Sequence, residues 1–370
     1  MKRKLFCVLL CAAMVSSLLA GCGGGGGASS AAPAAPAAPA SSASGDGGSA
    51  APASDGGSGG KTYAIVTKAA GNPFNEKVAE GFQSVIEGQG GTCIVRHPEA
   101  ATADAQVSVI QSLISQGVNS ICIAANDENA LQAALQEARD EGISICCVDS
   151  KVNKDSRQTF VNQAGVNEIG QCLMEAVYDI SGGEGDWAIL SATSQATNQN
   201  AWIEAMKTAM QDEKYSKLNL VEVAYGDDEP QKSTDQTQAL LSKYPDLKVI
   251  CAPTTVGINA AAKVLQDNQS SVKLTGLGLP SEMAEYIGDD DAHSCPYMYL
   301  WNPVDLGRLG AYTSIALVDG TITGATGDKF SAGDMGDYEV VAADDGGTEI
   351  ILGAPFKFDP ANINDWKDVY

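Results

Sequence analysis

The sequence predicts an α/β fold with two similar, doubly wound parallel-sheet lobes joined by a three-strand hinge. From Lys61 onward, short apolar strands alternate with amphipathic helices and no long linker interrupts them. Repeated strand–helix–strand units predict parallel sheets covered by helices on both faces. The pattern comes as two sets of similar period, and the roughly 310 residues involved are enough for two separate cores.

The first set begins directly after Lys61. Apolar residues recur at helical spacing, as Val78, Phe82 and Val85 do. We expect strands at 63–66, 92–95, 120–123 and 144–148, and helices at 75–88, around 107–114 and at 128–141.

The second set follows the same rhythm. We expect helices at 168–180, 199–210, 231–244 and 256–266, and strands at 186–190, 219–224, 248–251 and 273–277. The chain is expected to cross between lobes near Asn162–Gly165, near Trp301 and within Ala332–Asp337. The N-terminal lobe would then hold residues 61–163 and 302–335, and the C-terminal lobe residues 164–301 and 336–370.

The first residues have the pattern of an export signal. A basic start precedes an apolar run, Leu5 to Leu19, that is short for a membrane span. The run closes on Leu19-Ala20-Gly21-Cys22, which resembles the bacterial lipoprotein cleavage box. The resemblance implies a signal peptide over 1–21 and a lipid on Cys22 that anchors the protein to the membrane. An ordinary secretory signal is the alternative, and residues 22–60 read as the anchored cysteine and a flexible Gly/Ala/Pro/Ser tether.

The composition excludes several classes of function. A formal net charge of −23 disfavours binding to nucleic acid or to anionic lipid. The two histidines, His97 and His293, suggest no zinc site and no histidine-based catalysis. An odd number of cysteines follows Cys22 without a CxxC pair, and most lie in apolar strand patterns, where cysteine acts as a small hydrophobe. We therefore expect no metal and no cofactor.

Polar side chains follow the expected strands at the edge where parallel sheets bind ligands. Thr197, Asn198 and Gln199 come after the strand at 186–190. Their amides and hydroxyls suit a hydroxyl-rich neutral ligand better than a phosphate or a bond-breaking reaction. Capping of the helix that begins here is the competing role for Asn198.

Two charged residues follow strands of the first lobe. Asp149 can accept two hydroxyl hydrogen bonds as a carboxylate, and Lys68 can donate to hydroxyls and balance that charge. The alternatives are a turn or helix cap for Asp149 and a surface lysine for Lys68. Asn72 lies in the first strand–helix loop, and Gln163, at the first crossover, is a weaker candidate.

The second lobe adds hydroxyls and aromatic rings. Thr254 or Thr255 can donate after the strand at 248–251, while Pro253 shapes the loop. Trp202 lies one turn into its helix, where a core role competes with ligand contact, and Trp301 is placed at a crossover to form a wall of the cleft. The remaining acidic candidates read as solvated loop charge: Asp227-Asp228 and Asp289-Asp290-Asp291.

Several segments together resemble the periplasmic sugar-binding proteins of ABC importers. They are ILSATSQATNQNAWIEAMK (189–207), YGDDEPQKS (225–233), APTTVGINAAA (252–262), TGLGLPSEMA (275–284) and WNPVDLG (301–307), with TKAAGNPF (67–74) and IAANDENAL (123–131) in the first lobe. The chain is similar to the ribose/galactose type, periplasmic binding protein type I, and most similar to its rhamnose-binding branch.

The resemblance implies a monomer that closes its lobes on a small neutral monosaccharide and docks on the transmembrane subunits of an ABC permease. It also implies that Phe74 stacks on the sugar. Many relatives carry a second aromatic residue where this chain has Asn75, so stacking on one side is expected. Gly278 stands where ribose-type relatives usually carry an aspartate, so that contact is expected to be absent.

Two other functions remain open. The related autoinducer-2 receptors share Lys68, Asp149, Gln199 and Pro253 by resemblance, but usually carry an aspartate at Asn198 and an alanine at Thr255. A carbohydrate-active enzyme would need two opposed carboxylates or an activated nucleophile, and Asp149 is the one acid that the sequence places in the cleft. A repressor of the same fold is disfavoured because no DNA-binding segment precedes Lys61.

Overall fold

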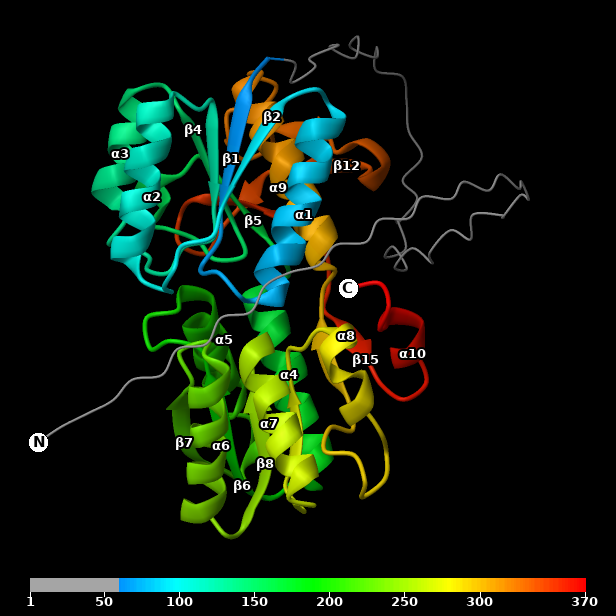
Figure 1. The fold of residues 1–370 in the computed structure, drawn as a ribbon. Coiled ribbons are helices and arrows are strands. Elements are labelled where there is room, and N and C mark those ends of the chain that lie inside the picture. Colours follow the sequence, from blue (N-terminus) through cyan, green and yellow to red (C-terminus); the bar gives the residue numbers. More distant parts are fainter. Residues whose placement is uncertain (1–59) are drawn as a thin grey trace, which may run out of the picture. The chain divides into compact units, whose positions relative to one another are not determined.

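A seven-stranded sheet forms the centre of the first lobe (Figure 1). This computed structural model describes residues 60–370. The strand order is β13-β14-β5-β4-β3-β1-β2, and all neighbours are parallel except β13 and β14. The strands are β1 (Thr62–Val66), β2 (Thr92–Arg96), β3 (Ser120–Ile123), β4 (Ser144–Val148), β5 (Thr159–Asn162), β13 (Val341–Ala342) and β14 (Thr348–Ile351).

Helices cover both faces of this sheet, as expected. Figure 1 shows α2 and α3 over one face and α1 and α9 over the other. The helices are α1 (Pro73–Gly88), α2 (Ala103–Gln116), α3 (Gln132–Asp140) and α9 (Pro303–Val318). Because both faces are covered, the central strands β1, β3 and β4 are largely apolar, and β3 is buried along its whole length.

Close packing of α1 on α9 fixes the last helix of the first lobe. A Cβ on Gly81 would lie 2.0 Å from the carbonyl oxygen of Val304, and one on Gly307 would lie 1.9 Å from that of Val78. Glycine at both positions lets the two backbones touch, so α9 returns to the first lobe although a second lobe separates it from α1 in sequence.

The second lobe contains a four-stranded parallel sheet of order β7-β6-β8-β9. Its strands are β6 (Gly185–Ser191), β7 (Leu218–Tyr225), β8 (Leu247–Ala252) and β9 (Lys273–Gly276), and its main helices are α4 (Val166–Ser181), α5 (Thr197–Ala209), α6 (Pro230–Lys243) and α7 (Thr255–Asp267). An antiparallel pair, β10 (Met298–Leu300) with β15 (Phe356–Phe358), and the short helices α8 (Pro280–Met283) and α10 (Ile363–Trp366) extend it. A hairpin of β11 (Lys329–Ser331) and β12 (Asp337–Glu339) follows α9.

The chain passes between the lobes three times, but one expected crossover is wrong. The first two passages follow β5 and β10. The third lies after β14 and not within 332–337, because Glu349 pairs in parallel with Phe160 of β5. Residues 341–351 therefore belong to the first sheet, whereas 336–370 was assigned to the C-terminal lobe.

The structure bears only on the expectations that concern residues 60–370. The signal peptide, Cys22 and almost all of the tether lie outside the described residues. Over residues 60–370, no helix combines the length and apolar character needed to cross a membrane. All seven cysteines in this range are free, and five of them are buried.

Candidate functional site

The carboxyl ends of strands from both sheets surround one small cavity. The first lobe contributes Lys68, Asn72, Phe74, Asn75 and Asp149 to the lining of this cavity. The rest of the lining comes from the chain between the start of α5 and the end of β10: Gln199, Trp202, Asp228, Pro253, Thr254, Thr255, Leu277, Leu300 and Trp301, which follows β10 directly.

Ten residues expected from the sequence line this cavity, and three expected ones, Gln163, Thr197 and Asn198, do not. Asn198 lines a neighbouring cavity together with Gln163 and Thr197. It nevertheless touches two lining residues through hydrogen bonds, so it belongs to the same polar cluster.

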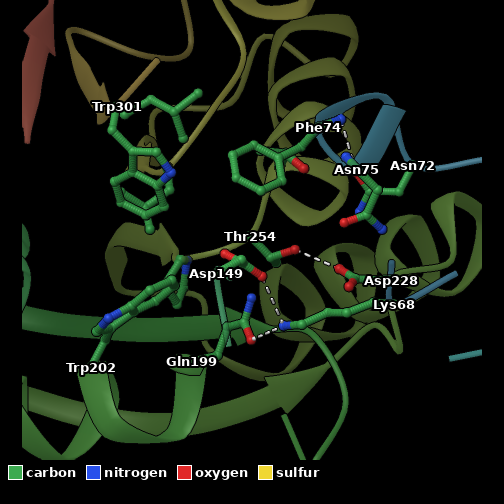
Figure 2. A pocket seen from close by; sticks show the side chains of 14 residues that line it. Lys68, Asn72, Phe74, Asn75, Asp149, Gln199, Trp202, Asp228, Thr254 and Trp301 are labelled. Atoms are coloured by element: carbon green, nitrogen blue, oxygen red, sulfur yellow. Dashed lines mark hydrogen bonds and ion pairs between the residues drawn. The ribbon is translucent and has the colours of Figure 1, made fainter. Parts of the chain in front are cut away.

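Four side chains from the two lobes form this polar cluster, and Figure 2 shows three of them, Lys68, Asp149 and Gln199. The ammonium of Lys68 donates to Asn198 Oδ1 at 2.7 Å and to Gln199 Oε1 at 3.3 Å. Asn198 Nδ2 donates to Asp149 Oδ1 at 3.2 Å, and the Lys68 Nζ lies 3.6 Å from Asp149 Oδ2. The expected pair of Lys68 and Asp149 is therefore present, and it is joined directly to the N-terminal turn of α5 in the second lobe.

Asp149 occupies an unusual position. It follows β4 directly, has a φ of 62°, and is 5 % exposed. A positive φ is uncommon outside glycine, although aspartate and asparagine tolerate it. Burial raises the pKa of the Asp149 carboxyl, the charge and hydrogen bond of Lys68 oppose that rise, and the nearby Asp228 adds to it. Burial therefore disfavours the charged form of Asp149, and Lys68 offsets part of this cost.

This raised pKa makes a prediction about the ligand-free protein. Because folded Asp149 holds its proton more tightly than the unfolded chain, it reduces stability as pH rises from about 4 through its folded pKa. The free energy of unfolding of wild type minus that of Asp149→Asn should therefore fall as pH rises. Urea unfolding of both proteins between pH 4 and 7 measures this difference. A difference that rises with pH would mean that the pKa is lowered instead.

Two helix starts decide which polar atoms face the cavity. Asn72 caps α1, its Oδ1 accepting from the backbone N–H groups of Phe74 and Asn75, so its amide N–H₂ is the group left for a ligand. At the start of α7, Thr254 makes no side-chain cap. Its hydroxyl donates instead to Asp228 Oδ1 at 2.5 Å.

Four lining residues were missed by the sequence reasoning: Asn75, Asp228, Leu277 and Leu300. The expectation that Asp228 is solvated loop charge is wrong. Asp228 has a φ of 55° in the loop between β7 and α6, and this turn directs it toward Thr254 while Asp227 pairs with Lys232. Asp290, by contrast, is an exposed loop residue that contacts His293, as a solvated charge would.

Aromatic rings form another part of the lining. Trp301 meets Phe74 edge-on with ring centroids 6.2 Å apart, and meets Trp202 at 5.7 Å. All three are at most 6 % exposed. Trp202 is therefore buried and also faces the cavity, so the two roles expected for it do not exclude each other.

The lining favours an uncharged, hydroxyl-rich ligand of small size. One lysine and two aspartates give it a formal charge of −1, which opposes anionic ligands. Carboxylates, amides and a hydroxyl can meet sugar hydroxyls, and the rings can meet C–H faces. Within residues 60–370, no group of three or more His, Cys, Asp or Glu side chains is arranged to hold a metal ion.

Comparison with known proteins agrees with this geometry. Residues 63–322 match the periplasmic binding protein domain. The chain is 62% identical to an ABC transporter solute-binding protein from Clostridium phytofermentas that was solved with bound L-rhamnose, covering 84% of this chain and 99% of that one at a TM-score of 0.83. LsrB from Clostridium saccharobutylicum, in complex with AI-2, is 24% identical with a TM-score of 0.77, covering 82% and 99%, a likeness of fold alone.

A curated relative is more distant. The D-ribose/D-allose-binding protein of Pseudomonas aeruginosa is 26% identical over 156 residues, which are 40% of this chain. The match spans about half of that relative, 47% of its length. The first of the solved structures is named as a solute-binding protein and the curated relative as a sugar-binding protein. The chain therefore belongs to the periplasmic binding protein family and has the fold of sugar ABC-transporter solute-binding proteins.

Proposed function

We propose that this protein captures a neutral monosaccharide, L-rhamnose in particular, by closing its two lobes, and delivers it unchanged to an ABC permease. The observation that carries the proposal is the cavity in which Lys68 and Asp149 of one lobe meet Gln199 of the other beside aromatic rings. Further support is the L-rhamnose bound to the relative of 62% identity.

The energetics of such a site are modest. A micromolar dissociation constant needs about −8 kcal/mol, and hydrogen bonds to charged groups contribute about 1.5–3 kcal/mol each. Closure follows when the ligand contacts both lobes, because the shut state then binds it better than the open state. In this scheme Lys68, Asn72, Asp149, Gln199, Thr254 and Thr255 hold hydroxyls, Phe74, Trp202, Pro253 and Trp301 contact the ring, and Asn198 joins the lobes.

The proposal places the protein on the outer face of the cell membrane as a monomer. Its support is the signal-like start and the box ending at Cys22, with the lipid on Cys22 and residues 22–60 as the tether.

Catalysis is not proposed. The lining acids are paired, Asp149 with Lys68 and Asn198 and Asp228 with Thr254, and the chain belongs to a family of binding proteins. Turnover of a glycoside by pure protein would contradict this part.

The autoinducer-2 signal is the second candidate ligand. Lys68, Asp149, Gln199 and Pro253, which this chain shares with those receptors by resemblance, all line the cavity. Asn198 distinguishes the two functions, because an aspartate there would place a second carboxylate beside Asp149.

Binding measurements decide between the two ligands. We expect L-rhamnose to bind with a micromolar or tighter dissociation constant in titration calorimetry. At a free L-rhamnose concentration of a hundred times the dissociation constant, the sugar should stabilise the folded protein by about 2.7 kcal/mol, which raises the melting temperature. D-Ribose and the furanosyl signal serve as comparison ligands in the same assay. No heat and no shift with L-rhamnose, alongside tight binding of the furanosyl signal, would replace the first function by the second.

A further inference from the structure

Trp301 carries a buried hydrogen-bond donor without a partner. Its side chain lines the cavity and is 4 % exposed, yet among residues 60–370 its Nε1 finds no acceptor. An indole N–H only donates, and a buried donor left unpaired is unfavourable. Figure 2 shows the Trp301 ring beside the cavity with its nitrogen on the side that faces Phe74. The arrangement is explained if a ligand atom accepts this hydrogen bond.

The surroundings of this donor are apolar. Phe74 and Trp202 contact the Trp301 ring, and Leu300 precedes it in the chain. Leu277, 2 % exposed, is held beside the same strand by a bridge to Tyr299. Figure 2 shows Trp301 and Phe74 across the cavity from Lys68 and Gln199. A sugar in this cavity therefore meets Lys68, Asp149 and Gln199 at one end and the Trp301 N–H beside apolar side chains at the other, with Asn72 and Asn75 next to Phe74.

We propose that Trp301 Nε1–H donates to the ring oxygen of a pyranose, and that Phe74, Leu277 and Leu300 surround the carbon substituent next to that oxygen. The inference rests on the proposed function and adds the orientation of the sugar and the basis of its selection. A ring ether oxygen accepts and does not donate, so a lone donor satisfies it. A hydroxyl in the same place would bring an O–H that the apolar wall leaves unpaired.

The substituent beside the ring oxygen then determines specificity. In a 6-deoxyhexose it is a methyl group, which the apolar wall favours. In an ordinary hexose it is a hydroxymethyl group, whose hydroxyl would be buried without a partner. The site is therefore selective for 6-deoxyhexopyranoses, with their remaining hydroxyls directed to Lys68 and Asp149.

Calorimetry with matched ligands tests the hydrogen bond. The ligands are L-rhamnose and its carbocyclic analogue, in which CH₂ replaces the ring oxygen. Wild type should bind the analogue about tenfold more weakly, and Trp301→Phe should bind L-rhamnose about tenfold more weakly, equal to about 1.4 kcal/mol. Trp301→Phe should discriminate between the two ligands by less than threefold, because it lacks the donor that senses the ring oxygen.

Two further arms complete the test. L-Mannose, which differs from L-rhamnose by the 6-hydroxyl, should bind wild type at least tenfold more weakly. Trp187→Phe is the matched control, because Trp187 in β6 also has a buried Nε1 without an acceptor among residues 60–370 but does not line the cavity. It should bind L-rhamnose as wild type does.

The outcomes separate the inference from the function. Equal discrimination by wild type and Trp301→Phe, or L-mannose binding as tightly as L-rhamnose, overturns the inference and leaves sugar capture intact. Wild type that does not bind L-rhamnose overturns both. If Trp301→Phe fails to fold, the wild-type comparison decides: a carbocyclic analogue that binds as tightly as L-rhamnose overturns the inference.

Discussion

Replacing Lys68 by methionine should weaken L-rhamnose binding at least a hundredfold, the largest loss expected from one substitution in the site. Methionine keeps an unbranched apolar chain but removes the ammonium, which contacts Asn198, Gln199 and Asp149. Breaking a buried ion pair by removing one partner costs about 3–5 kcal/mol, because the other charge stays buried without compensation. The closed state also loses two hydrogen bonds between the lobes, those of Lys68 to Asn198 and Gln199. Titration calorimetry measures the dissociation constant.

Two companion variants identify the cause. Lys77→Met removes an exposed lysine of α1 that pairs with Glu80, and it should leave binding unchanged. Lys68→Met combined with Asp149→Asn removes both charges, so it should be more stable than Lys68→Met alone in urea unfolding. If Lys68→Met binds within threefold of wild type, or if the double variant is the less stable one, the buried charge pair is not what holds the site.

The position of this pair follows from a regularity that the sequence displays. Alternating strands and helices identify parallel sheets, and the residues that follow parallel strands meet at one edge. Lys68 follows β1, Asp149 follows β4, and Pro253 follows β8, so their convergence was predictable without knowing any contact.

Other parts of the site carry no such signal. Asp228 reaches the cavity because a turn with a positive φ directs it toward Thr254, 26 positions further along the chain. In the sequence it is one of two adjacent aspartates in a polar loop. Leu277 and Leu300 extend apolar strand patterns, so nothing distinguishes a cavity wall from a core residue. Their roles depend on tertiary contacts.

The third crossover was misplaced for a similar reason. The strand β14 has four residues, and it pairs with β5, where Phe160 lies 189 positions before its partner Glu349. Four residues that follow two aspartates and two glycines, as those of β14 do, give only a weak strand pattern. Its assignment to the first lobe comes from the partner strand and not from its own residues.

Asp149→Ala should weaken L-rhamnose binding by about 1.5–3 kcal/mol, or about 10- to 150-fold, as expected for loss of a charged hydrogen-bond partner. Alanine also disfavours the φ of 62° at this position, so part of the loss could arise from the backbone. Asp149→Asn separates the two causes, because asparagine tolerates this conformation and keeps the shape while removing the charge. If the backbone conformation dominates, Asp149→Asn should lose less than half of the binding free energy that Asp149→Ala loses.

Asp149→Asn and Asp149→Ala together distinguish loss of the carboxylate from backbone strain, because the two causes predict different affinities for Asp149→Asn. If the carboxylate accepts two sugar hydroxyls, Asp149→Asn loses most of the affinity that Asp149→Ala loses, since an amide offers one acceptor oxygen in place of two. Calorimetry at pH 7 measures both, and urea unfolding without sugar reports the backbone contribution separately. Unchanged affinity in Asp149→Ala would remove Asp149 from the binding site and leave its ion pair with Lys68 as a purely structural contact between strand ends.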